Sequence, residues 1–161
     1  MRMSVEITYR GDAEVMKKEL GPIVNAALAQ AIEEWHERTL PRHFQPSAAG
    51  RYHYKARTVA WKKHKRKKVG HDNPLVYTGD LKREVTRMIE IKTLKTKPSA
   101  TGKMRGPRYL HMTPSANYRH NYAAELLAMT RAETAAMARR VDQIVTKALN
   151  NLKETRTVRV A

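Results

Sequence analysis

Apolar residues recur at helical spacing in two long segments of the chain. In the first third the stripe consists of Val24, Ala27, Leu28, Ala31, Ile32 and Trp35, at positions i, i+3, i+4 and i+7. In the last third, Thr130 and Glu133 form a capping box before a face made of Met137, Val141, Ile144, Val145, Ala148, Leu149 and Leu152. These patterns predict two long, core-facing helices. We expect Gly21-Pro22 to interrupt the first helix, because proline cannot continue a helical turn.

Alternating or apolar segments predict short strands. Residues 4–9 alternate, and Met88, Ile89, Ile91 and Leu94 follow a short predicted helix at 81–88. We expect a returning strand at 109–112, with 96–108 as the loop of a β-hairpin, and a short closing strand at 157–160. The 161 residues fit a single domain, 1–161. The predicted fold is α+β, with two long helices packed on a small, mostly antiparallel sheet and a basic inserted loop or arm at 44–72.

Charge adds a second feature. The chain has 32 Lys and Arg against 15 Asp and Glu, a formal net charge of +17. The excess lies in two acid-free segments, 38–71 and 91–124. Such charge indicates an anionic partner, namely nucleic acid, an anionic membrane face or an acidic protein. No apolar run approaches the roughly 18 residues of a membrane span, and the N-terminus has no apolar signal region. We therefore expect an intracellular product without a membrane partner.

The densest basic segment runs from residue 51 to 68. It contains the predicted DNA- or partner-facing residues Arg51, Lys55, Arg57, Lys62, Lys63, Lys65, Arg66, Lys67 and Lys68. Tyr52, Tyr54 and Trp61 are interleaved with them, a mixture that suits phosphates, sugars and bases. An acidic protein surface and a solvated loop without a ligand are the alternatives. Because like charges repel, we expect this segment to be extended and mobile in an isolated subunit.

The sequence offers little for catalysis. The absence of cysteine excludes thiolate metal sites and thiol nucleophiles. The seven histidines are scattered, and no motif of a nucleotide-binding or hydrolase site occurs. His71-Asp72-Asn73 could belong to a nuclease metal site, but the acid-free segments remove most of the carboxylates that would hold an ion. We predict no enzyme, no catalytic residue, no metal and no cofactor.

One further motif is the corner at residues 73–81. Its key residues are Pro74, Leu75, Val76, Thr78, Gly79 and Leu81. We expect Gly79 to form a bend, Thr78 or Asp80 to cap the following helix, and Leu75, Val76 and Leu81 to be buried.

This corner, following a long helix and a linker with Tyr52, Tyr54, Arg57, Trp61 and Lys62, resembles the tail-completion (head–tail joining) proteins of tailed bacteriophages. The resemblance implies a structural virion protein without enzymatic activity, located in the neck and assembled in the host cytoplasm. It also implies a homo-oligomeric ring that joins the head connector to the tail tube around the DNA channel. The implied partners are neighbouring connector and tail-tube or terminator proteins, and the viral DNA.

Two other functions stay open on the residues alone. One is a free, non-sequence-specific nucleic-acid-binding protein, and the other is a small nuclease. A free binder should carry its basic residues on ordered elements. Here the predicted helices are balanced in charge and the cations lie in inserts, which favours the neck protein.

Overall fold

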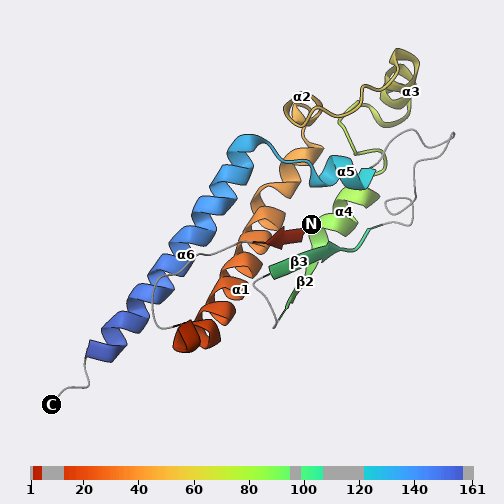
Figure 1. Ribbon diagram of the computed structural model, residues 1–161. Coiled ribbons are helices and arrows are strands. Elements are labelled where there is room, and N and C mark those ends of the chain that lie inside the picture. The colour runs from red at the N-terminus through yellow and green to blue at the C-terminus, as the bar shows by residue number, and fades with distance from the viewer. Residues whose placement is uncertain (1, 5–12, 95–98, 107–121, 158–161) are drawn as a thin grey trace. The chain divides into compact units, whose positions relative to one another are not determined.

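The computed structural model describes residues 2–4, 13–94, 99–106 and 122–157, and it has the predicted α+β fold (Figure 1). The elements follow in the order β1 (Arg2–Ser4), α1 (Ala13–Arg38), the 3-10 helix η1 (Leu40–Phe44), α2 (Ala48–Arg51), α3 (Val59–Val69), α4 (Asp80–Arg87), β2 (Ile89–Thr93), β3 (Ser99–Met104), α5 (Tyr122–Leu127) and α6 (Arg131–Thr157). The chain divides into two compact units. The first unit comprises residues 1–33, 91–102 and 131–161, and the second comprises 34–90 and 103–130.

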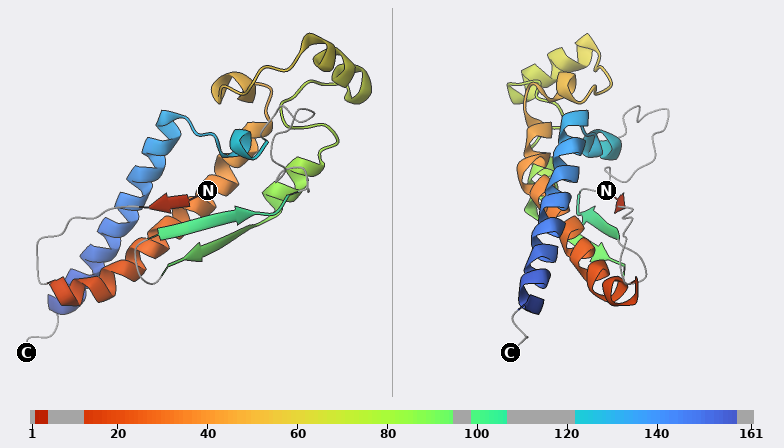
Figure 2. Two further views of the ribbon diagram at one scale, coloured as in Figure 1. Left: turned by 45° about the vertical axis from the view of Figure 1, so that its right-hand side comes forward. Right: turned by 60° about the vertical axis from the view of Figure 1, so that its left-hand side comes forward.

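The sheet has the strand order β1-β3-β2. Strands β1 and β3 pair antiparallel, with Met3 opposite Ala100, and Figure 2 shows β2 and β3 running in opposite directions. Strand β1 ends at Ser4, where the predicted first strand begins, and residues 5–9 lie outside the described part of the chain. The small, antiparallel sheet is as predicted.

One side chain of α1 joins this helix to the β2–β3 hairpin in the first unit. The Asn25 Nδ2 donates to the carbonyl oxygen of Leu94 (2.7 Å), and its Oδ1 accepts from the Ser99 backbone N–H (2.9 Å). The helix thereby satisfies backbone groups at both ends of the hairpin turn, which is also closed by the Leu94 N–H to Ser99 C=O bond.

The two predicted apolar stripes form the core. On α1 the stripe residues Val24, Ala27, Leu28, Ala31, Ile32 and Trp35 are all buried. On α6, which runs alongside α1 in the opposite direction (Figures 1 and 2), Met137, Val141 and Val145 are buried and Ile144, Ala148 and Leu149 are half-buried. Helix α6 begins at Arg131, so Thr130 holds the N-cap position, as predicted.

Two sequence-based expectations are wrong. Pro22 lies inside an unbroken α1, because its exposed ring leaves the buried stripe intact and apolar burial outweighs the lost hydrogen bond. Strand β3 occupies 99–104, within the predicted loop 96–108, because strand pairing overrides the loop-like composition of a segment flanked by Pro98 and Pro107. Helix α6 includes Thr157, the first residue of the expected closing strand, and residues 158–160 of that strand lie outside the described residues. The returning strand predicted at 109–112 lies outside the described residues.

The second unit contains a compact aromatic core. Its buried residues include Trp35, Leu40, His43, Phe44 and Tyr52. The His36 Nε2–H, also buried, donates to the Val85 carbonyl oxygen (2.7 Å), which connects the last turn of α1 to α4. This framework supports the segment in which basic residues are densest, residues 51–68.

Candidate functional site

The basic segment is not an extended arm. Residues 59–69 form α3, so the expectation of an extended chain is wrong there. The Thr58 hydroxyl oxygen accepts from the Trp61 N–H (3.2 Å) at one end. At the other end Gly70 has φ 77° and its N–H bonds to Arg66 C=O. These two caps satisfy terminal backbone groups, and the helix spreads its cations around its circumference.

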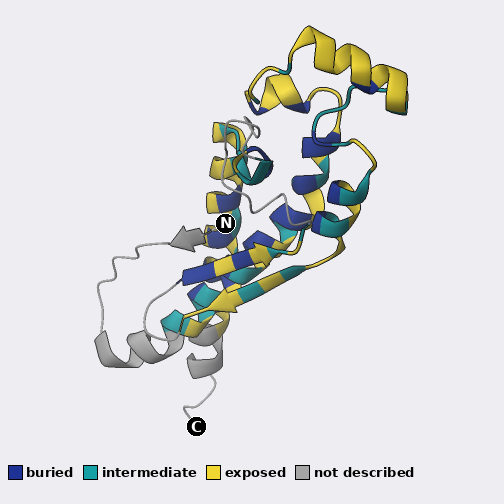
Figure 3. Cartoon of the chain, turned by 90° about the vertical axis from the view of Figure 1, so that its right-hand side faces the viewer, coloured by how far each residue is buried: buried dark blue, intermediate teal, exposed yellow. Residues whose placement is uncertain are grey.

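Most cations of α3 face water. Lys62, Lys63, Arg66, Lys67 and Lys68 are exposed, and α3 itself contains no acidic residue. Figure 3 shows this helix almost entirely exposed. Lys63 and Lys67 each lie two residues from the buried Lys65, about 200° around the helix. They therefore project from the face opposite to the buried one, where phosphates could approach.

Lys65 differs from its neighbours because it is buried, with 1% of its surface exposed. Its Nζ donates to the Asn73 carbonyl oxygen and lies 4.9 Å from the centre of the Trp61 ring. Burial lowers the pKa of Lys65, and the Asp72 carboxylate opposes this shift. Lys65 is thus a structural residue that attaches α3 to the corner.

Arg57 is also structural. Its Nη1 and Nη2 donate to Oε1 and Oε2 of Glu125 at 2.9 and 2.6 Å, a bidentate pair whose side chains are only 14% and 10% exposed. The guanidinium further donates to the Lys55 carbonyl oxygen and lies 5.9 Å from the centre of the Tyr122 ring. This pair connects the start of the basic segment to α5.

A buried histidine orders the tyrosines of the linker. The His43 ring stacks on Tyr52, with centroids 3.8 Å apart and planes 11° apart. Its Nδ1 lies 2.5 Å from the Tyr54 hydroxyl and 3.1 Å from the Glu125 carbonyl oxygen. Tyr52 is buried and belongs to the core, so Tyr54 is the linker tyrosine that reaches a cavity.

The corner adopts two left-handed backbone conformations, Leu75 with φ 58° and Gly79 with φ 89°. The bend at Gly79 is as predicted, and Leu75 and Leu81 are buried. Val76 is half-buried, which corrects the expectation that it lies in the core. The N-cap of α4 is Gly79, which has no side chain to accept a bond, so the expectation that Thr78 or Asp80 caps this helix is wrong. The Thr78 hydroxyl donates to Asp80 Oδ2 (2.5 Å). This hydrogen bond is the largest cause of the lowered pKa of Asp80, and the neighbouring Arg83 lowers that pKa further.

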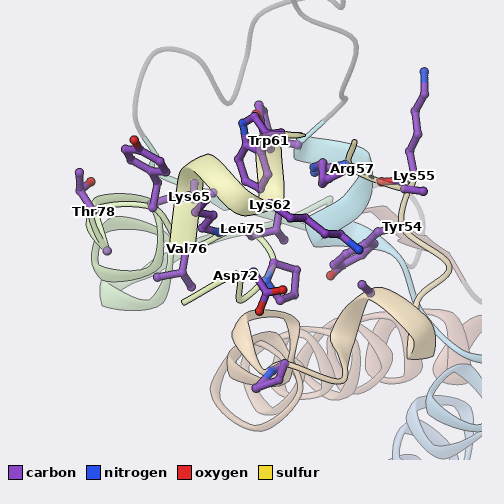
Figure 4. A pocket seen from close by; sticks show the side chains of 18 residues that line it. Tyr54, Lys55, Arg57, Trp61, Lys62, Lys65, Asp72, Leu75, Val76 and Thr78 are labelled. Carbon is purple, nitrogen blue, oxygen red and sulfur yellow. Dashed lines mark hydrogen bonds between the residues drawn. The ribbon is translucent and has the colours of Figure 1, made fainter. Parts of the chain in front are cut away.

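The basic segment and the corner line one cavity of about 570 Å³ in the second unit (Figure 4). From the segment come Lys55, Arg57, Lys62 and Lys65, together with Tyr54 and Trp61. The corner supplies Pro74, Leu75, Val76, Thr78, Gly79 and Leu81. The structure therefore unites two features that the sequence offered separately. Arg51, Lys63, Arg66, Lys67 and Lys68 do not line the cavity.

Sequence analysis missed the acidic partners of the basic residues. Glu125 holds Arg57, and Asp72 binds Arg66 through two hydrogen bonds of 3.1 and 2.5 Å. The Arg66 hydrogen bond lowers the pKa of Asp72. Asp72 directly follows the acid-free segment 38–71, and Glu125 directly follows the acid-free segment 91–124. Their position in the sequence was thus a usable signal.

Two of the described histidines have structural contacts. His36 and His43 are buried and hydrogen-bonded within the second unit, and His111 and His120 lie outside the described residues. Among the residues that the structure describes, no three His, Asp or Glu side chains gather as metal ligands. Within the same residues, no helix combines the length and apolar character needed to cross a membrane.

Comparisons with protein-family models, with curated proteins and with solved structures found no match to this chain.

Proposed function

We propose that the protein is a structural, non-enzymatic subunit of a tailed-bacteriophage neck, a tail-completion protein that forms a ring around the DNA channel. In this proposal the outer face of α3 lies against DNA phosphates without reading sequence. The supporting observation is α3 itself: six of its 11 residues are Lys or Arg, none is acidic, and five of the six cations are exposed. A ring repeats this face once per subunit, which multiplies the positive potential in the channel.

The charge distribution supports the choice of α3 over other surfaces. The second unit carries 18 Lys and Arg against seven Asp and Glu, whereas the first carries 14 against eight. Within the second unit Arg57 is neutralised by Glu125, and Arg66 is bonded to Asp72. Four exposed cations, Lys62, Lys63, Lys67 and Lys68, lie together on α3, which has no acidic residue of its own.

A free, non-sequence-specific nucleic-acid-binding protein is the second candidate. One observation favours it: the cations lie on a capped, ordered helix, whereas the preference for the neck protein rests partly on the expectation that the basic segment is a loop. Both candidates use the same phosphate-facing surface. They differ in whether the protein assembles into a closed ring.

The test of the shared surface is duplex DNA binding as a function of salt. Each phosphate contact contributes about 0.9 to the slope of log K against log salt, so Lys63→Ser, Lys67→Ser and Lys68→Ser combined should lower that slope by up to about 2.7. The matched control replaces Lys82, Arg139 and Lys147, which are exposed on α4 and α6, by Ser and should change it much less. Equal slopes for the two variants would contradict the assignment of α3.

Native mass spectrometry of the purified protein separates the two candidates. A closed oligomer whose DNA binding depends on α3 supports the neck subunit. A monomer or dimer that binds DNA through α3 supports the free binder. Protein that binds no duplex at low salt would overturn both.

A further inference from the structure

The cavity between α3 and the corner has a different character from the outer face of α3. Most of its lining residues are apolar or aromatic, and they include Leu75, Val76, Leu81, Pro46, Pro74, Tyr54, Trp61, Tyr77 and Tyr122. Trp61 and Tyr77 stay 38% and 43% exposed, among the larger exposed apolar side chains of the described residues. Exposed aromatic residues around an apolar recess are typical of a protein–protein hot spot.

Five polar side chains of the cavity wall are already bonded within the second unit. These pairs are Tyr54 with His43, Arg57 with Glu125, Lys65 with Asn73, Asp72 with Arg66, and Thr78 with Asp80. A nucleobase needs hydrogen-bonding partners for its edges, whereas an apolar side chain needs none. The wall therefore suits an apolar anchor better than a base.

Charge at the cavity indicates what surrounds that anchor. Lys55 and Lys62 line the cavity and are exposed (Figure 4). The Asp72 carboxylate in the same wall is bonded to Arg66 and also interacts electrostatically with Lys62. Acidic residues beside the anchor would complement the two lysines. The chain's own segment 107–121 contains no acid, and a second copy carries the same net charge of +17. Neither complements the site as an acidic partner does.

We infer that this cavity is a docking site for a segment of a different protein, in which a large apolar side chain is flanked by Asp or Glu. The anchor enters between Trp61 and the corner residues Leu75 and Val76, and the flanking acids lie near Lys55 and Lys62. This inference goes beyond the proposed function and does not depend on DNA binding by α3.

Fluorescence anisotropy with two labelled peptides tests it, using the full chain. The probe Glu-Asp-Glu-Phe-Asp-Glu contains the anchor, and Glu-Asp-Glu-Ala-Asp-Glu has the same charge without it. Burial of the phenyl ring should make the first peptide bind about tenfold tighter or more. Equal affinity for the two peptides would show that only charge is recognised and would overturn the inference.

A bulky substitution locates the binding. Ala56 lines the cavity and is exposed, so Ala56→Trp should fill the site without disturbing the core and remove the preference for Phe. Ala60→Trp, on an exposed residue of α3 outside the cavity lining, is the matched control and should retain it. If thermal melting shows that Ala56→Trp is unfolded, Tyr77→Ala serves instead and should also reduce the preference. A preference unchanged in the folded cavity variant would overturn the inference.

Three further measurements separate this inference from its competitors. The combined Ser variant at Lys63, Lys67 and Lys68 should lose duplex affinity and keep the Phe-to-Ala preference, which distinguishes failure of one proposal from failure of the other. A thymidine 12-mer that displaces the Phe peptide and is itself blocked by Ala56→Trp would assign the cavity to a nucleobase. A change of oligomeric mass in Ala56→Trp would assign it to a second copy. Either result would overturn the inference.

Discussion

Helix α1 buries residues in every turn of its second half, whereas among the described residues of α3 only Lys65 is buried. The stripe on α1 is aliphatic and aromatic, and its stability comes from removing apolar area from water. Helix α3 has little apolar area to bury. It is fixed by end caps, by the bond from Lys65 to Asn73 and by the Arg57–Glu125 pair just before it. The difference leaves the cations of α3 available to a partner.

Breaking the Arg57–Glu125 pair is expected to have the largest effect on the region around α3. Glu125→Gln leaves a guanidinium buried without its counter-charge, which typically costs about 3–5 kcal/mol. Urea denaturation measures the change in the free energy of unfolding. Arg83→Gln, which removes the exposed Arg83–Asp80 pair, is the control and should have little effect. Similar small losses in both variants would mean that the buried pair does not hold this segment.

Truncating the stripe of α1 tests the other half of the comparison. Leu28 is fully buried, so Leu28→Ala should lower the free energy of unfolding by about 2–5 kcal/mol. Val59→Ala removes an apolar side chain of α3 that is 83% exposed and should be nearly neutral. Comparable losses at the two positions, measured by thermal or urea unfolding, would contradict the contrast between the helices.

The C-terminal cap of α3 gives a smaller effect. Gly70 has φ 77°, and a Cβ atom added there would meet no other atom within 4 Å, so Gly70→Ala should cost about 1–2 kcal/mol from backbone strain alone. Gly50→Ala, within α2 and equally open, should stabilise by about 0.5–1 kcal/mol. Helicity and urea midpoints of the two variants should therefore shift in opposite directions.

The subtlest effect is a dependence on pH. Burial lowers the pKa of Lys65 below its ordinary value of 10.5. The folded protein therefore releases this proton before the unfolded chain does, and the Lys65 contribution to stability rises with pH up to about 10.5. Lys65→Met should lack this rise. Parallel profiles of unfolding free energy for wild type and variant between neutral pH and 10.5 would contradict the lowered pKa of Lys65.

The sequence by itself determined the elements whose cause is local or periodic. The stripes from Val24 to Trp35 and from Met137 to Leu149 predicted the long helices, because burial follows a period of 3.6 residues. The strand near Ile89 and the bend at Gly79 were predicted for similarly local reasons. Composition gave a wrong prediction at β3, where it indicated a loop. The strand forms there because it pairs with a segment far away in the sequence.

Only the tertiary structure decided the roles of the basic residues. Nine cations between Arg51 and Lys68 look alike in sequence, yet Arg57 and Lys65 are internal connections while Lys63 and Lys67 face water. That division depends on Glu125, 68 positions from Arg57, and on the corner packing beneath α3. Charge is a property of each residue, but desolvation and pairing are properties of the folded neighbourhood, and those decide which charges can meet a ligand.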